Sequence, residues 1–183
     1  MGSVLCVRPE TVSGTKKMNK LKIYIAGKVS KESIFKTHHW RDDFCAVLQK
    51  NLGGGVTLDS IDPLKHETTV ISPKAIFEKD CQLINQADVL VVYLSDDISV
   101  GGSQEILIAR YLYKPVIGFA PKGGKFNGSK KEMLGRVIDN YQDPFVFSTC
   151  DIVCGTIEEV SAALRNVDDI SSTGLSIIDK ALQ

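Results

Sequence analysis

The feature that most constrains the fold is a strand–turn–helix–strand succession in the middle of the chain. Residues 89–94 read Val-Leu-Val-Val-Tyr-Leu, an apolar run typical of a buried strand, and residues 115–120 form a second such run. Between them, residues 99–105 make a glycine-rich turn that opens an apolar helix extending to about residue 112. Two strands joined through a helix lie parallel in one sheet, so this stretch predicts a βαβ unit.

The same alternation continues along the rest of the chain. Strands are expected at 22–27, 56–61, 89–94, 115–120 and 145–147, with an extension of the last to 153 left open. Helices are expected at 33–52, 73–86, from the end of the 99–105 turn to about 112, 130–140 and 156–164, and loops at 65–72 and 121–131. This pattern predicts an α/β fold, a Rossmann- or flavodoxin-like doubly wound sheet of about five parallel strands with helices on both faces. Ligands of such sheets bind at the carboxyl ends of the strands.

Composition bounds the domain organisation and the partners. With 183 residues, 43% of them hydrophobic, the chain fits one globular domain. We expect that domain at 21–165, a flexible N-terminal arm at 1–20, and a C-terminal tail at 166–183 in which 175–182 is a candidate short helix. The 22 basic and 22 acidic residues balance, so neither nucleic acid nor an anionic membrane surface is an expected partner.

Targeting and cysteine patterns point to an ordinary cytoplasmic protein. No apolar run approaches the roughly 20 residues that span a bilayer, and residues 1–20 lack the apolar segment of a secretory signal. The five cysteines have no paired spacing, which argues against a zinc site and favours a reduced cytosolic compartment. We therefore expect a cytoplasmic protein without a metal or a cofactor.

Two carboxylates occupy unusual positions. Glu105 opens the apolar helix after the glycine-rich turn, where it serves either as a reactive group or as an ordinary complement to the helix dipole. Asp80 falls inside the apolar stripe of the helix expected at 73–86, which comprises Ile76, Phe77, Leu83, Ile84 and Ala87. Burying an unpaired carboxylate costs several kcal/mol, so Asp80 either caps a neighbouring loop or lines a cleft.

Other polar residues have competing interpretations. The adjacent pair His38-His39 points to different helix faces, so a shared metal is not expected. Arg41 contacts either a ligand or a surface carboxylate, and the sequence does not choose between the two. Asp62, before a proline, fits a turn as well as a base contact, and Asp88 is expected to cap structure.

Three pieces of the sequence, in order, resemble the nucleoside 2-deoxyribosyltransferase family, including its 2′-deoxynucleoside 5′-phosphate N-hydrolase branch. The pieces are Ile23–Gly27, then Asp80 separated by seven residues from Asp88, then Ser99-x-Gly101-x-x-x-Glu105 running into Ala109 and Lys114-Pro115-Val116. Together they span residues 22–120. Each piece is short, and the resemblance depends on their order and spacing.

The resemblance implies a Rossmann-like fold and cleavage of the bond between a deoxyribose and a nucleobase. It implies that Glu105 attacks the anomeric carbon and forms a glycosyl-enzyme, that Asp80 assists the leaving base, and that Tyr24 holds Glu105 by a hydrogen bond. A helix amino terminus would keep Glu105 ionised, whereas an apolar surround would raise the pKa of Asp80. Two-step displacement of this kind retains the configuration of the sugar.

The branches of the family differ in the residues that contact the sugar and its phosphate. Transferases usually carry an acid six residues before the glutamate, whereas the nucleotide hydrolases carry a serine there that binds phosphate; here it is Ser99. The resemblance further implies substrate contacts from Gly27, Ser30 and the amides around Gly101. It also implies a homodimer in which Ser129 of the partner subunit completes the site.

Two departures work against a phosphate site. The hydrolases carry an arginine after the first-strand glycine, and here Lys28 offers a charge but no bidentate fork. The acidic pair Asp96-Asp97 just before Ser99 would also repel a phosphate. We therefore predict a monophosphate N-hydrolase with a deoxyribosyltransferase as the alternative, and a non-catalytic nucleotide-binding module as a further one. A phosphoryl-accepting receiver is disfavoured because Gly27-Lys28 stands where its acidic pair would be.

Overall fold

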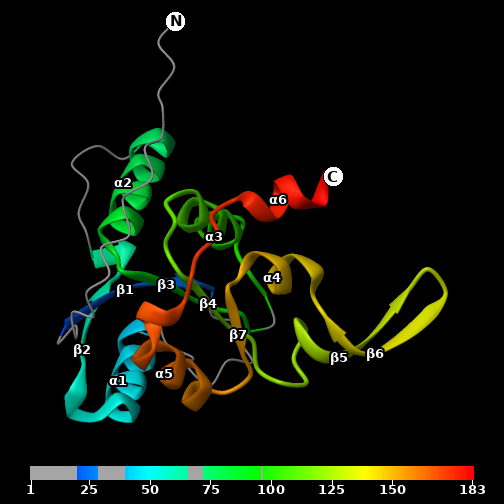
Figure 1. The fold of residues 1–183 in the computed structure, drawn as a ribbon, viewed down its shortest axis with the longest axis horizontal. Helices are drawn as coiled ribbons and strands as arrows, with labels where there is room; N and C mark the ends of the chain where they lie inside the picture. Colours follow the sequence, from blue (N-terminus) through cyan, green and yellow to red (C-terminus); the bar gives the residue numbers. More distant parts are fainter. Residues whose placement is uncertain (1–19, 29–39, 66–71, 96) are drawn as a thin grey trace, which may run out of the picture.

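The computed structural model describes residues 20–28, 40–65, 72–95 and 97–183, and it confirms the predicted α/β fold. Five strands form one parallel sheet in the order β2-β1-β3-β4-β7. They are β1 (Lys20–Gly27), β2 (Thr57–Ile61), β3 (Val89–Tyr93), β4 (Val116–Phe119) and β7 (Ile152–Cys154). Figure 1 shows these strands between two layers of helices.

The helices divide between the two faces of the sheet. On one face lie α1 (Trp40–Leu52) and α5 (Ile157–Arg165), and on the other lie α2 (Pro73–Gln86), α3 (Val100–Tyr111) and α4 (Pro144–Thr149). The short helix α6 (Ser176–Ala181), within the segment expected at 175–182, lies against α4. Single 3-10 turns occur at η1 (Gly53–Gly55), η2 (Pro63–Lys65) and η3 (Val167–Asp169).

The alternation of side chains along β1 divides the core in two. Ile23 and Ile25 pack into the cluster beneath α1 and α5, whereas Tyr24 and Ala26 pack into the cluster beneath α2 and α3. This follows from the two-residue period of a strand, in which successive side chains point to opposite faces. Tyr24 is therefore directed toward α3, and its exposed fraction is 0%.

Caps set the starts of the helices. Ser72 accepts a hydrogen bond from the Ala75 amide at 3.1 Å, and Pro73 follows it, as predicted. Ser99 caps α3 in the same way by accepting from the Gly102 amide at 3.0 Å. The sequence suggested that Glu105 lies in the first turn of this helix. Because α3 begins at Val100, Glu105 lies in its second turn instead.

The helix predicted at 130–140 is wrong. The structure has an antiparallel hairpin there, formed by β5 (Asn127–Met133) and β6 (Arg136–Gln142). Strand β5 begins before residue 130, so it also includes the last residues of the loop expected at 121–131. Its turn residues Leu134 and Gly135 both have positive φ values, +54° and +72°, the backbone of the two-residue turn that joins antiparallel strands. The hairpin projects away from the main sheet (Figure 1).

The strand predicted at 145–147 is also wrong, because these residues belong to α4. The side chain of Asp143 accepts hydrogen bonds from the amides of Phe145 and Val146 at 3.0 and 3.1 Å, and Pro144 occupies the first helical turn. Capping thus overrides the strand preference of an aromatic and β-branched run. The fifth strand is β7, which overlaps the end of the extension to 153 that the sequence left open and continues to Cys154.

The carboxyl end of β1 extends beyond its neighbour β2. Strand β1 pairs with β2 over residues 20–24 and with β3 over residues 23–27. The last three residues of β1 therefore have a strand on one side only. This step in the sheet lies at the carboxyl edge, where an α/β fold binds its ligands.

The chain beyond α5 returns to the body of the fold. Val167 is buried in the core beneath α1 and α5. Farther on, Thr173 accepts a hydrogen bond from Arg110 of α3 at 3.0 Å, and Arg110 also pairs with Asp151. Residues 167–173 are thus tied to α3 and to the start of β7.

Candidate active site

Tyr24 and Glu105 form the centre of the candidate site. The Tyr24 hydroxyl donates a hydrogen bond to Glu105 Oε1 at 2.7 Å, as the resemblance implied. Tyr24 comes from β1 and Glu105 from the inner side of α3, beside the step at the carboxyl edge of the sheet. Since the effect of the helix dipole falls off within the first turn, the direct contact that holds Glu105 is the phenol.

Burial has the largest effect on the pKa of both residues of this pair. It raises the pKa of the Glu105 carboxyl, while the hydrogen bond from Tyr24 and the charge of Arg41 oppose that rise. Burial and the neighbouring Glu105 raise the pKa of the Tyr24 phenol as well. The sequence had suggested that a helix terminus would keep Glu105 ionised at low cost; its burial has the opposite effect.

Asp80 lies beside this pair, on α2. Burial raises the pKa of its carboxyl, and its charge raises the pKa of both Glu105 and Tyr24. Asp80 Oδ1 is buried and has no hydrogen-bond partner among the described residues. A buried acceptor left without a partner costs about 1–3 kcal/mol, which a bound ligand with a proton to donate would recover.

Gly27 brings the end of β1 close to the start of α3. Its φ is +122°, and an added Cβ would stand 2.4 Å from the Tyr93 carbonyl oxygen, so no other residue fits. A Cβ added to Gly102, in the first turn of α3, would lie 3.7 Å from the Gly27 Cα. Gly101 is exposed in that same turn, next to the cap Ser99.

Lys28 and Asp97 link the two loops above this edge. Lys28 Nζ lies 2.8 Å from Asp97 Oδ2, and the exposed fractions of the two side chains are 55% and 46%. The lysine lowers the pKa of the Asp97 carboxyl. Ser95 also donates a hydrogen bond to the Lys28 carbonyl at 3.3 Å.

The remaining candidates from the sequence lie elsewhere or have structural roles. Ser30 and His38-His39 are outside the described residues. Ser129 lies on β5, where its hydroxyl donates to the Lys125 carbonyl at 3.4 Å. Asp88 accepts from the Lys22 amide at 2.7 Å, the structural role predicted for it.

Arg41 is the residue whose role the sequence left open. Its Nε and Nη2 donate to the carbonyls of Ile25 and Gly27 at 3.0 and 3.2 Å. It also lies 3.8 Å from Asp62 Oδ1, and that carboxylate accepts from the Leu64 amide in the turn after β2. No local pattern marks Arg41, because its partners lie outside its own helix, on β1 and in the turn after β2.

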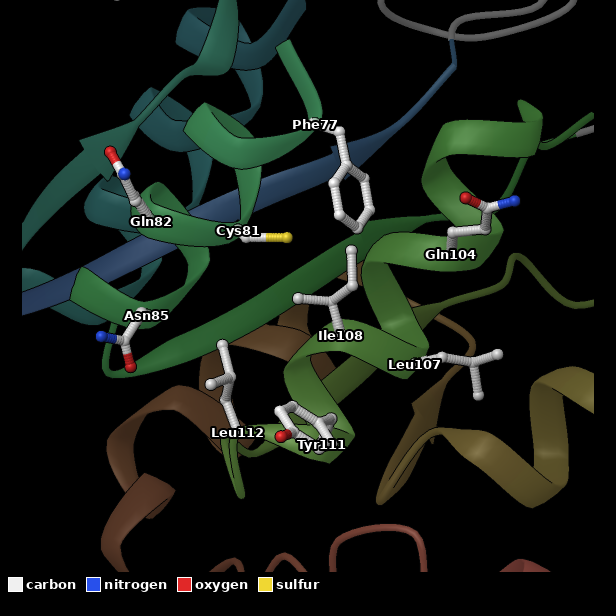
Figure 2. A pocket seen from close by; sticks show the side chains of 9 residues that line it. All are labelled: Phe77, Cys81, Gln82, Asn85, Gln104, Leu107, Ile108, Tyr111 and Leu112. Carbon is white, nitrogen blue, oxygen red and sulfur yellow. The ribbon is translucent and has the colours of Figure 1, made fainter. Parts of the chain in front are cut away.

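An apolar groove on the surface does not include the catalytic candidates. It has a volume of about 680 Å³, lies between α2 and α3, and is lined mainly by apolar side chains. Figure 2 shows Phe77 and Cys81 of α2 facing Ile108 and Leu112 of α3 across it. Phe77 is 53% exposed, so it is not the core residue that the apolar stripe predicted, whereas Leu83, Ile84 and Ala87 are buried. Ile76 is 42% exposed as well.

The described ranges hold neither a candidate metal site nor a membrane-spanning helix. There, no three His, Cys, Asp or Glu side chains are grouped so that they could hold a metal ion. No helix in those ranges has the length and apolar character needed to cross a membrane.

Comparison with known proteins gives matches at the level of structure. No protein-family model and no curated protein sequence matches the chain. A conserved protein from Enterococcus faecalis V583 superposes with a TM-score of 0.61 at 16% identity, over 81% of this chain and 99% of that one. A 2-deoxyribosyltransferase from Leishmania mexicana superposes with a TM-score of 0.50 at 18% identity, over 80% and 97% of the two chains. The chain therefore has the fold of nucleoside 2-deoxyribosyltransferase-like proteins.

Proposed function

We propose that this protein is an enzyme that cleaves the N-glycosidic bond of 2′-deoxynucleoside 5′-monophosphates and releases the free base to water. The observation that carries the proposal is the 2.7 Å hydrogen bond from Tyr24 to Glu105, with the unpartnered Asp80 Oδ1 buried beside it. This arrangement lies at the carboxyl edge of an α/β sheet whose fold is shared with a 2-deoxyribosyltransferase.

The proposed first step uses the two carboxyl groups in different states. Tyr24 holds one oxygen of the ionised Glu105, and the other oxygen attacks the anomeric carbon of the sugar. As the new C–O bond forms, the bond from the anomeric carbon to the base breaks, and its electron pair goes to the base nitrogen. Asp80, whose pKa burial raises, donates a proton to the departing base.

In the second step, water attacks the anomeric carbon and the ester bond to Glu105 breaks. Asp80, now a carboxylate, accepts a proton from that water, which restores both groups to their starting states. Two displacements at one carbon retain the configuration of the sugar, as in retaining glycosidases.

The amino end of α3 supports a 5′-phosphate in this scheme. Gly101 places an exposed backbone segment in the first turn of a 12-residue helix, and such ends bind anions, whereas the Gly102 amide already donates to Ser99. Lys28 follows Gly27 at the facing end of β1 and adds a positive charge. In the structure this lysine is paired with Asp97, so a phosphate has to compete with that carboxylate.

A homodimer is the assembly that we propose. The apolar groove between α2 and α3 offers an uncharged surface, which a second copy can cover without like-charge repulsion. The β5–β6 hairpin projects beyond the sheet, far enough from the body to contact a neighbouring subunit (Figure 1). In this assembly the partner's Ser129 contributes to the phosphate site.

The alternative function is transfer of the deoxyribosyl group from Glu105 to a second base. The carboxylate Asp97 near Lys28 favours it, because a negative charge there suits sugar hydroxyls better than a phosphate. A non-catalytic nucleotide-binding module is the third possibility.

Product analysis separates these functions. Each deoxynucleoside and its 5′-monophosphate is incubated with the protein, with and without an acceptor base, and free base is measured by liquid chromatography. Base released from monophosphates without an acceptor supports the hydrolase, and release that needs an acceptor supports the transferase. Tight binding of an intact nucleotide supports the binding module. A deoxyribosyl adduct on Glu105, detected by mass spectrometry and absent from Glu105→Gln, tests the nucleophile.

A further inference from the structure

The step at the end of β1 leaves backbone carbonyls without a strand partner. Beyond Tyr24, β1 has no neighbour on the β2 side, and the carbonyls of Ile25 and Gly27 point that way. Alternate carbonyls of a strand point to the same side, so two carbonyls along this edge have no neighbouring strand to bond with. The guanidinium of Arg41 binds both of them, at 3.0 and 3.2 Å.

Arg41 is held firmly in this position. It projects from the first turn of α1, its guanidinium lies 4.6 Å from the centre of the Trp40 ring, and Asp62 Oδ1 is 3.8 Å away. Its side chain is only 12% exposed. Its planar fork reaches two carbonyls at once, which the single ammonium of a lysine does not reproduce.

The position of Arg41 places a buried cation next to the reacting groups. Tyr24 and Gly27 belong to the same strand end that Arg41 fixes, and Glu105 is hydrogen-bonded to Tyr24. Burial raises the pKa of Glu105, Asp80 and Tyr24, and the charge of Arg41 opposes that rise at all three, as the smallest of the influences on each.

We infer that Arg41 is a positioning residue of the active site: it replaces the missing strand at the end of β1, and it places a buried positive charge near the Tyr24–Glu105 pair. This inference rests on the proposed function, since it assigns Arg41 a part in the reaction of Glu105. Arg41 acts through the strand and through its charge, and it makes no contact with the reacting atoms in this scheme.

The charged and titratable groups around Glu105 give the direction of the effect. Among the described residues, Tyr24 of β1 and Arg41 of α1 lower the pKa of Glu105, whereas Asp80 of α2 raises it and burial raises it further. Without the positive charge of Arg41, less opposes the rise that burial and Asp80 cause in the pKa of Glu105. Glu105 then takes up a proton at higher pH, and activity falls off earlier on the acidic side.

The test compares Arg41→Gln and Arg41→Lys with the matched control Arg165→Gln, an exposed arginine on α5. Steady-state base release is measured from about pH 4 to about pH 9, a range that covers the titration of carboxyl groups with a raised pKa. For Arg41→Gln we expect the acidic limb of kcat/KM to move up by about one pH unit and kcat to fall about tenfold or more. KM should change little.

Arg41→Lys separates the two parts of the role. Because the charge is kept and the fork is lost, its acidic limb should stay near that of the parent protein while kcat still falls. A parent-like kcat in Arg41→Lys, or an unmoved acidic limb in a folded Arg41→Gln, overturns the inference. If Arg41→Gln does not fold, as judged by circular dichroism, Arg41→Lys still decides it through kcat.

A readout without turnover distinguishes this inference from the proposed function. The Glu105 carboxyl is titrated by carbon NMR in the parent protein and in Arg41→Gln, with its signal assigned by loss in Glu105→Gln. A higher pKa in Arg41→Gln supports the electrostatic role even if no substrate is cleaved, and an unchanged pKa contradicts it. Absence of base release from the parent protein with every substrate overturns the proposed function alone.

Discussion

Tyr24 and Glu105 are 81 residues apart in the chain, yet the phenol hydroxyl donates a 2.7 Å hydrogen bond to Glu105 Oε1. The bond joins the first strand of the sheet to the helix after the third. It is also a direct polar contact to the Glu105 carboxyl, whose pKa burial raises. The reactivity of Glu105 should therefore depend on Tyr24.

Replacing Tyr24 with phenylalanine should lower activity without unfolding the protein. The ring is retained, so the loss of one hydrogen bond should reduce the free energy of unfolding by only about 0.5–1.5 kcal/mol. Because the phenol lowers the pKa of Glu105, its removal should shift the acidic limb of the activity profile to higher pH and reduce kcat about tenfold. Tyr113→Phe, at a 51% exposed position outside the groove, is the control and should behave like the parent. Unchanged kcat in Tyr24→Phe would contradict the role of the bond.

Glu105→Gln should stabilise the folded protein at neutral pH. Burial raises the folded-state pKa of Glu105 above its unfolded value, so ionisation costs stability as the pH rises through the folded pKa. Below the unfolded pKa the carboxyl is protonated in both states, and the advantage of the amide disappears. We expect Tm to rise by about 2–4 °C at pH 7 and to match the parent near pH 4. Calorimetry at both pH values checks this, and equal Tm at pH 7 would be the contrary result.

Asp97→Asn should improve the use of monophosphates. It releases Lys28 from its 2.8 Å pair with Asp97 and removes a negative charge from the proposed phosphate site. Because the pair is exposed, we expect KM for a monophosphate to fall only about two- to fivefold, with little change for the nucleoside. The same substitution made in a Lys28→Met background should have a smaller effect. An equal gain for nucleoside and monophosphate would show that Asp97 does not act on the phosphate.

Leu107→Asp should disrupt the proposed dimer. Leu107 is 42% exposed and lines the groove between α2 and α3, where a buried carboxylate would lack a partner. We expect the variant to elute as a monomer when light scattering follows size-exclusion chromatography, whereas the parent should elute as a dimer. Leu64→Asp, at a 75% exposed position on η2 outside the groove, should leave the mass unchanged. A dimeric Leu107→Asp would place the interface elsewhere.

Local patterns predicted the sheet up to β4 and the helices α5 and α6, and they failed between residues 130 and 147. The strands and helices up to residue 120 have strong apolar periods and strong caps, such as Ser72-Pro73 before α2. From 130 to 140, apolar residues at helix-like spacing concealed a turn at Leu134-Gly135, whose positive φ values bring two short strands together. At 145–147 a strand-like run became helical because Asp143 caps it. In both places one or two turn or cap residues outweighed the periodicity.

The site shows the same division. The sequence by itself determined the alternation of strands and helices up to β4, the start of α2, and the presence of carboxylates at Asp80 and Glu105, because periodicity and capping depend on residues within a few positions of one another. Only the tertiary structure decided that Asp80 Oδ1 lacks a partner and that Arg41 binds the free carbonyls of β1. Those relationships depend on strand order and register, since β2 stops pairing at Tyr24 while β1 continues to Gly27.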